Sequence, residues 1–359
     1  MEVRRFWSVP HVERHGAELA LLIALAVLLE LAAGVGLAYV AGFSQVRAVV
    51  GDVHWGWLGV LAGALVVSFA GYLLAYQGIF RVEGGPRLPR RQMHAVVVAG
   101  FGGLLAHGWG ALDKKALKVA GADEHDAKAR ATCLAGLELA VLALGGCGAA
   151  IAVLVSGLGA PPPDFTLPWA IIPVPAMLIG FWAAERYRDR FRGRPGWRGA
   201  VGIFLEAAHL IRELFVRPRW GWAMLGMALF WAADAFAMWA GLATFGMRMN
   251  AVTLLVGYAT GMVFTRRTAP LAGAGILALA LPVCLWYSGG PLAAVVAGVF
   301  AYRILVLWLP LPVALASLPT LRTMGERRIA QAERKAARGP SSRRPPPGAP
   351  RTAAGRSVR

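Results

Sequence analysis

The chain has 359 residues, of which 57% are apolar and only 16% are charged, and its formal net charge is +18. This balance excludes an ordinary soluble domain, in which about 25% of the residues are charged. The apolar residues form long runs, and a helix needs about 20 such residues to cross a bilayer. We therefore predict an all-α, polytopic integral membrane protein, with spanning helices in the runs at 19–41, 58–80, 131–156, 220–245 and 292–317.

The distribution of Lys and Arg predicts which segments are cytoplasmic, because short cytoplasmic loops are enriched in these residues. Basic residues occur in the N-terminal segment 1–18 and gather at 81–91, 113–130 and 186–219, whereas 157–168 contains none. We place the basic segments in the cytoplasm and 157–168 outside. A sixth span must then connect 157–168 to 186–219.

Two apolar segments do not fit simple crossings. The first, 95–112, lies between two cytoplasmic segments and is too short to cross twice, so we predict a re-entrant segment that turns at the glycines of 100–103. The second, 251–287, must begin and end outside, and Arg266, Arg267 and Pro270 interrupt it. It forms either a re-entrant hairpin or two short spans.

The prediction is therefore about six full spans plus two broken or re-entrant segments, within a transmembrane domain at 19–318. Each half has two helices, a broken segment and a closing helix, and the second half begins on the opposite side. This order suggests an inverted repeat, in which substrate sites form near the midplane of the membrane.

The segment 319–359 is expected to be a basic, largely disordered cytoplasmic tail. From residue 322 onward it contains eleven Lys and Arg against Glu326 and Glu333. A basic tail after a spanning helix favours contact with anionic lipid headgroups over nucleic acid. The abundance of Ala, Gly and Arg suggests a bacterial cytoplasmic membrane protein, with both termini in the cytoplasm.

Charged residues inside spans usually face protein or water and have partners, because they are costly in hydrocarbon. Four residues qualify: Glu30, Glu138, Asp234 and Arg303. Asp234 and Arg303 have opposite charge and similar expected depth, so they form a possible pair, either an interhelical lock or a substrate or gating site. Glu30 has no evident partner in the sequence, which favours a structural role.

Two further groups are candidates for headgroup binding. Arg266 and Arg267 either bind a lipid phosphate or are ordinary loop charges. His107, Asp113 and Lys114 form either a headgroup-binding mouth or a solvated start of an interfacial helix. The segment 200–215 has an apolar face and is expected to lie as an amphipathic helix on the cytoplasmic surface. That face carries Val201, Phe204, Leu205, Ala208, Ile211 and Phe215.

Signatures of catalysis are absent from the sequence, which contains no GxSxG, Walker A or HExxH motif. The three cysteines, Cys133, Cys147 and Cys284, lie in or beside apolar runs without the spacing of metal ligands. We therefore expect no enzymatic activity, no cofactor and no metal site.

Three stretches resemble the membrane region of the lysylphosphatidylglycerol synthase and flippase superfamily. They are FGGLLAHGWGALDKKALKVAG at 101–121, YATGMVFTRRTAPLAGAGILALAL at 258–281 and GGPLAAVVAGVFAYRILVLWLPLP at 289–312. The Tyr302-Arg303 pair resembles a Tyr-Arg pair in the last helix of that family. The chain resembles the stand-alone members that lack the synthase domain.

This resemblance implies a flippase that moves a phospholipid, in the first place an anionic one, or a polyprenyl-linked lipid. Asp234, Arg266, Arg267 and Arg303 would line its cavity. The chain departs from the family at Leu277 or Ala278, where an apolar residue replaces a glutamate, and this argues against lysylphosphatidylglycerol as the substrate. The alternative is a non-transporting scaffold that binds a lipid synthase or glycosyltransferase through its tail or through 186–219.

Overall fold

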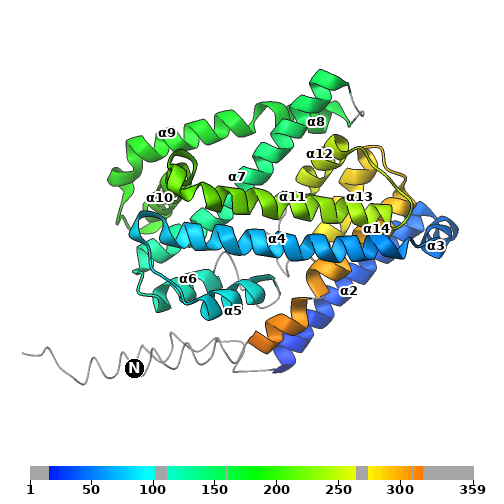
Figure 1. Cartoon of the computed structure of the whole chain (residues 1–359), viewed down its shortest axis with the longest axis horizontal. Coiled ribbons are helices and arrows are strands. Elements are labelled where there is room, and N and C mark those ends of the chain that lie inside the picture. Colours follow the sequence, from blue (N-terminus) through cyan, green and yellow to red (C-terminus); the bar gives the residue numbers. More distant parts are fainter. Residues whose placement is uncertain (1–15, 102–110, 158–160, 264–273, 309, 318–359) are drawn as a thin grey trace, which may run out of the picture.

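The computed structural model describes residues 16–101, 111–157, 161–263, 274–308 and 310–317, and these residues form an all-α bundle (Figure 1). Arg266, Arg267, His107 and the basic tail, for which we made predictions, lie outside the described residues. The long helices are α2 (Gly16–Ala41), α4 (Trp55–Arg81), α7 (Glu124–Ser156), α9 (Pro173–Phe191), α10 (Gly196–Val216) and α11 (Gly221–Ala243). The shorter helices are α3 (Phe43–Gly51), α5 (Arg90–Phe101), α6 (Ala111–Val119), α8 (Pro163–Ile171), α12 (Ala251–Met262), α13 (Ile276–Tyr287) and α14 (Leu292–Arg303).

In the part of the chain that the structure describes, six helical segments are long and apolar enough to cross a membrane, which confirms the predicted polytopic all-α architecture. They cover 23–41, 55–84, 124–156, 163–191, 218–243 and 292–317. The fourth joins α8 to α9 through Ile172, and the sixth joins α14 to a π-helical turn, Ile304–Trp308. Two shorter apolar helices, α12 and α13, complete the set. By helix length and composition, the chain is a multi-pass membrane protein.

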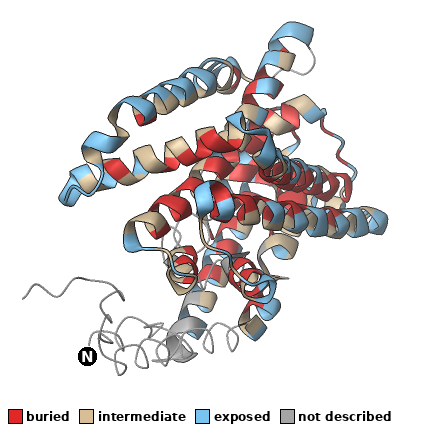
Figure 2. Ribbon diagram, turned by 60° about the vertical axis from the view of Figure 1, so that its left-hand side comes forward, coloured by how far each residue is buried: buried red, intermediate tan, exposed pale blue. Residues whose placement is uncertain are grey.

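The centre of the bundle is the contact between α4 and α11, which lie side by side and antiparallel (Figure 1). The two backbones come into contact where glycine meets glycine. A Cβ atom added at Gly71 would lie 2.7 Å from the carbonyl oxygen of Gly226, and one added at Gly226 would lie 2.8 Å from that of Gly71. Small residues of this kind let membrane helices pack backbone to backbone. Figure 2 shows the buried residues gathered in this central region and the exposed ones on the outer helices.

The end of α4 is bonded to the beginning of α7 through Arg130. The buried guanidinium group donates from Nη1 to the carbonyl oxygens of Ile79 (3.1 Å) and Val82 (2.9 Å), and from Nε to Asp126 on its own helix (2.8 Å). Because helix-terminal carbonyls have no partner within the helix, this arginine acts as a C-terminal cap for α4. The segment between them, which contains α5 and α6, therefore leaves and rejoins the bundle at one end. The re-entrant turn predicted at 100–103 lies largely outside the described residues.

A second returning segment is formed by α12 and α13, which pack against each other. A Cβ added at Gly257 would lie 2.7 Å from Ser288 Oγ, and one added at Gly261 would lie 2.9 Å from Leu281 Cα. The beginning of α12 is thus next to the end of α13. Each has 12 residues and a length of about 18 Å, against about 30 Å of hydrocarbon, so neither crosses a bilayer alone.

The helix predicted at 200–215 is present within α10, but the residues that it buries differ from the predicted apolar face. α10 packs against α7 and α9. Of the predicted apolar face only Ile211 is buried, and Phe204 is 56% exposed. The buried side instead carries Gly202, Ala207, Leu210 and Leu214, together with Glu213, which is paired with Arg217. Tertiary packing by two neighbouring helices therefore selected a different face from the one that hydropathy favoured.

We expect Gly71→Ala to destabilise the protein by about 1–3 kcal/mol, because the added methyl group overpacks the contact between α4 and α11. Gly63 is the matched control, since it lies on the same helix with open space around it. Gly63→Ala should leave the stability unchanged or raise it by up to about 1 kcal/mol through helix propensity. Thermal unfolding in detergent measures both, and equal melting temperatures would contradict the proposed close contact.

Replacement of Arg130 by Met should lower the free energy of unfolding by about 1.5–3 kcal/mol, because buried carbonyl oxygens at the end of α4 lose a charged donor. Lys128→Met is the control: Lys128 is nearby on α7, but its ion pair with Glu124 is largely exposed. Denaturant titration of both variants gives the comparison. Similar losses for both would show that Arg130 is not a cap.

Candidate functional site

The buried arginine of the last span, Arg303 on α14, is paired with Glu30 on α2. Its Nε lies 2.7 Å from Glu30 Oε1 and its Nη2 lies 3.1 Å from Glu30 Oε2, and both side chains are buried. This two-bond geometry fits the planar guanidinium group. The hypothesis of an Asp234–Arg303 pair is therefore wrong, and Glu30 does have a partner.

The same carboxylate also reaches α13. The backbone N–H of Gly275, just before Ile276, donates to Glu30 Oε2 at 3.4 Å. Gly275 has φ +79°, a left-handed conformation that favours glycine. A carboxylate at the first turn of a helix is stabilised by the N–H groups that lack partners there. Glu30 thus ties α2 to both α13 and α14.

Asp234, in the middle of α11, lies in a separate buried cluster. Its Oδ2 accepts hydrogen bonds from the hydroxyl groups of Tyr302 on α14 (2.6 Å) and Tyr258 on α12. Tyr302 and Arg303 are consecutive, and successive helical residues point about 100° apart because 3.6 residues make a turn. α14 therefore directs one side chain to Asp234 and the next to Glu30, which explains why Arg303 and Asp234 do not pair.

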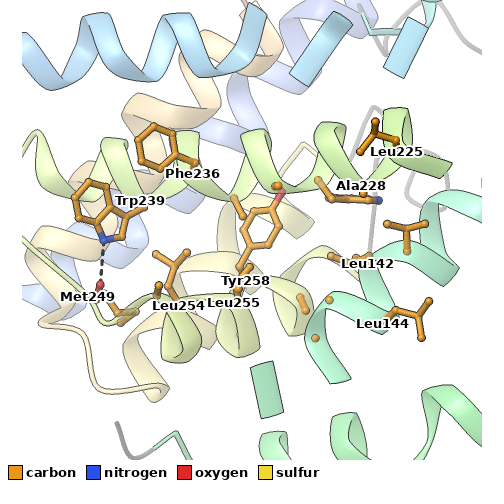
Figure 3. Close-up of a pocket in the computed structure, with 18 of the residues that line it drawn as sticks. Leu142, Leu144, Leu225, Ala228, Phe236, Trp239, Met249, Leu254, Leu255 and Tyr258 are labelled. Carbon is orange, nitrogen blue, oxygen red and sulfur yellow. Dashed lines mark hydrogen bonds between the residues drawn. The ribbon is translucent and has the colours of Figure 1, made fainter. Parts of the chain in front are cut away.

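A large apolar cavity lies beside this cluster, between α7, α11 and α12, with a volume of about 1040 Å³ (Figure 3). Tyr258 belongs both to the cavity and to the cluster: its side chain forms part of the wall and its hydroxyl group points towards α11 and Asp234. Trp231, one turn before Asp234, packs edge-on against Tyr258 and donates from Nε1 to the carbonyl oxygen of Glu138 (2.8 Å). The predicted residue Glu138 is itself buried on α7.

Asp113 and Lys114 lie apart from this site, on α6. Asp113 is buried and accepts a hydrogen bond from the hydroxyl group of Tyr76 on α4 (3.1 Å), so the reading of a solvated helix start is wrong for this residue. Lys114 is half-buried beside it, and burial lowers the pKa of the adjacent Lys115. The structure thus places these predicted residues in a contact between α6 and α4 and not at the cavity.

One group of possible metal ligands occurs among the described residues, at the junction of α4 and α10. Ligand atoms of Glu83, His209 and Glu213 lie within 4.8 Å of one another. The acids already have partners, however, since His209 contacts Glu83 (3.2 Å) and Arg217 contacts Glu213. We interpret the group as a charge network that holds α10 against the end of α4.

Sequence reasoning missed Tyr258, Trp231 and Arg130. The two aromatic residues were counted as ordinary apolar members of predicted membrane segments, although Tyr258 carries a hydroxyl group that needs a partner when it is buried. Arg130 was counted among the cytoplasmic loop charges. Its position eight residues before Glu138 on a continuous helix is the signal that places it inside the bundle.

Removal of either member of the Glu30–Arg303 pair should destabilise the protein strongly, by about 3–5 kcal/mol, because the remaining charge is buried without its partner. The double variant Glu30→Leu/Arg303→Met should recover most of this loss, because no buried charge remains. Thermal unfolding in detergent of the two single variants and the double variant tests this. Additive losses in the double variant would contradict a direct pair.

Comparison with models of protein families finds no match for this chain, and comparison with curated proteins finds none either.

Proposed function

We propose that this chain is a flippase or transporter that moves a lipid between the leaflets of a bacterial cytoplasmic membrane, with both termini in the cytoplasm. The observation that carries the proposal is Tyr258, which belongs at once to the wall of a large apolar cavity and to a buried carboxylate cluster. A lipid has an apolar and a polar part, and both kinds of environment adjoin on α11 and α12.

The position of the cavity supports this proposal. Two of its walls, α7 and α11, belong to membrane-length segments, and the third, α12, is a half-length helix of a returning pair. Transporters commonly form their substrate sites where broken or returning helices meet long ones. Ionisable residues inside membrane segments also tend to mark the pathways of substrates or ions, and Asp234 lies next to this cavity.

The proposed substrates are a phospholipid, anionic in the first place, or a polyprenyl-linked lipid. Among the described residues of the two buried clusters, the positive charge of Arg303 is offset by Glu30, and Asp234 accepts hydrogen bonds from two tyrosines. A lipid phosphate would therefore need other cations. Arg266 and Arg267, which follow α12 in the sequence, are the residues that we propose for this role.

A second candidate function, a membrane scaffold for a lipid synthase or glycosyltransferase, is favoured by one observation. In the span at 163–191, only 6% of the most apolar stretch is buried in the bundle, which is far less than in the other spans. Such a helix offers a large surface to a partner protein. Transport and scaffolding differ in whether the purified chain moves lipids without any partner.

The first test is leaflet exchange of fluorescent anionic, zwitterionic and lysyl-modified phospholipids and of a polyprenyl-linked lipid in proteoliposomes. Wild-type protein should exceed empty vesicles. Asp234→Asn and Tyr258→Phe should reduce exchange by about three- to tenfold, because each weakens a buried hydrogen bond that is worth about 0.5–1.5 kcal/mol.

Tyr39→Phe is the control for the hydroxyl deletion, because Tyr39 is 75% exposed on α2. Its exchange rate should equal that of the wild type. Gel filtration should show that all variants remain folded. If the wild-type protein moves none of these lipids, the transport proposal fails and co-purification of a partner becomes the decisive measurement for the scaffold.

A further inference from the structure

The cavity beside Tyr258 is a groove that follows α11. Its lining residues on this helix run from Met224 to Trp239 and recur once in every turn, singly or as adjacent pairs, so they occupy one face over about four turns. This length corresponds to about 22 Å. The opposite walls come from α7 and α12. We call this feature the α11 groove.

The walls of the α11 groove are almost entirely apolar. Three of its side chains carry a polar atom, and each of these atoms bonds to the protein itself. Trp231 Nε1 donates to the Glu138 carbonyl oxygen, Trp239 Nε1 donates to the Met249 carbonyl oxygen (3.0 Å, Figure 3), and the Tyr258 hydroxyl group donates to Asp234. Among the described lining residues, the groove therefore retains no free side-chain donor for a phosphate or a sugar.

The α11 groove is open along one side. Leu225, Ala228, Ala232 and Phe236 are exposed and follow one stripe of α11, and Gly145 is exposed on the α7 side. The two alanines in the middle of this stripe produce the hollow, and the larger Leu225 and Phe236 lie at its ends. Because α7 and α11 belong to membrane-length segments, the medium that meets this opening is the hydrocarbon of the bilayer.

The groove is also longer than one leaflet. Half of a hydrocarbon core of about 30 Å is about 15 Å, and a run of about 22 Å exceeds this even for a helix tilted by up to about 40°. A chain that lies along the whole groove within the core therefore passes the midplane. Such a surface can guide a chain from one leaflet towards the other.

We propose that the α11 groove binds a hydrocarbon chain of the lipid, and that the headgroup stays outside it. This inference rests on the proposed function and assigns the two parts of the substrate to different places. The occupant is an acyl chain of a phospholipid or an isoprenyl chain, which share the same apolar chemistry. Selection at this groove acts on the chain and not on the headgroup.

The test uses the full-length protein in vesicles with three photoactivatable probes, followed by peptide mapping. One phospholipid carries a diazirine at the end of an acyl chain, a second carries it in the headgroup, and an isoprenyl phosphate carries it in the chain. The chain probes should label groove residues of α7, α11 and α12, and the headgroup probe should not. Labelling by the acyl probe, by the isoprenyl probe or by both supports the inference and identifies the source of the chain.

Two variants fill the groove. They are Ala232→Trp and Gly145→Leu, and at Gly145 the added side chain has open space around it. Each variant should reduce chain labelling in the groove by about tenfold, because the new side chain occupies the volume that the hydrocarbon chain contacts. Ala32→Trp is the matched control, since Ala32 is an exposed alanine on the span formed by α2. Its labelling in the groove should equal that of the wild type.

Equal labelling of the groove by the headgroup probe, or unchanged chain labelling in both filling variants, would overturn the inference. Leaflet exchange is measured on the same vesicles to separate the two proposals. Chain labelling without exchange would remove transport and leave a chain-binding groove. Exchange without chain labelling in the groove would remove the groove from the pathway while transport remains.

Discussion

The structure depends on one constraint: a charge or a backbone carbonyl group that is held inside an apolar bundle needs a partner from the protein. Glu30 and Arg303 meet this need by joining the first described span to the last. Asp234 accepts hydrogen bonds from tyrosines on α12 and α14, and Arg130 donates hydrogen bonds to the carbonyl groups at the end of α4. The positions of the half-length helices follow from these bonds, because α13 begins at Glu30 and α12 is held at Asp234.

The central helix α11 uses small residues for two opposite purposes. Gly226 lets it approach α4 until the backbones touch, which makes this face rigid. On another face, Ala228 and Ala232 leave space that none of the described helices fills, which produces the groove. Tyr258 and Trp231 border that space and fix the side chains around it through bonds to α11 and α7. A rigid helix with one open face is well suited to guide a mobile ligand.

The six spans and the pair of short helices within 251–287 could be predicted from apolar runs and loop charges, because both depend only on position along the chain. The partners of the buried charges could not. Their similar expected depth in the membrane suggested that Asp234 and Arg303 pair. Depth does not specify the direction of a side chain around its helix axis, however, and Tyr302 and Arg303 point to different carboxylates. Arg130 was misplaced for a related reason, since a basic residue at the start of an apolar run looks like the end of a loop. The cavity depends on how three helices pack, which no single segment encodes.

The separation of 273 residues between Glu30 and Arg303 has a consequence for the biogenesis of the protein. At a synthesis rate of about 5–20 residues per second, the ribosome needs roughly 15–55 seconds after making Glu30 before it adds Arg303. During this interval the first span must be inserted with an acidic side chain whose partner does not yet exist. The insertion machinery or the neighbouring spans have to shelter it until the last helix arrives. The bundle is therefore completed only after the last span has been made, and products that terminate before Arg303 carry a carboxylate without its partner, which quality control can recognise.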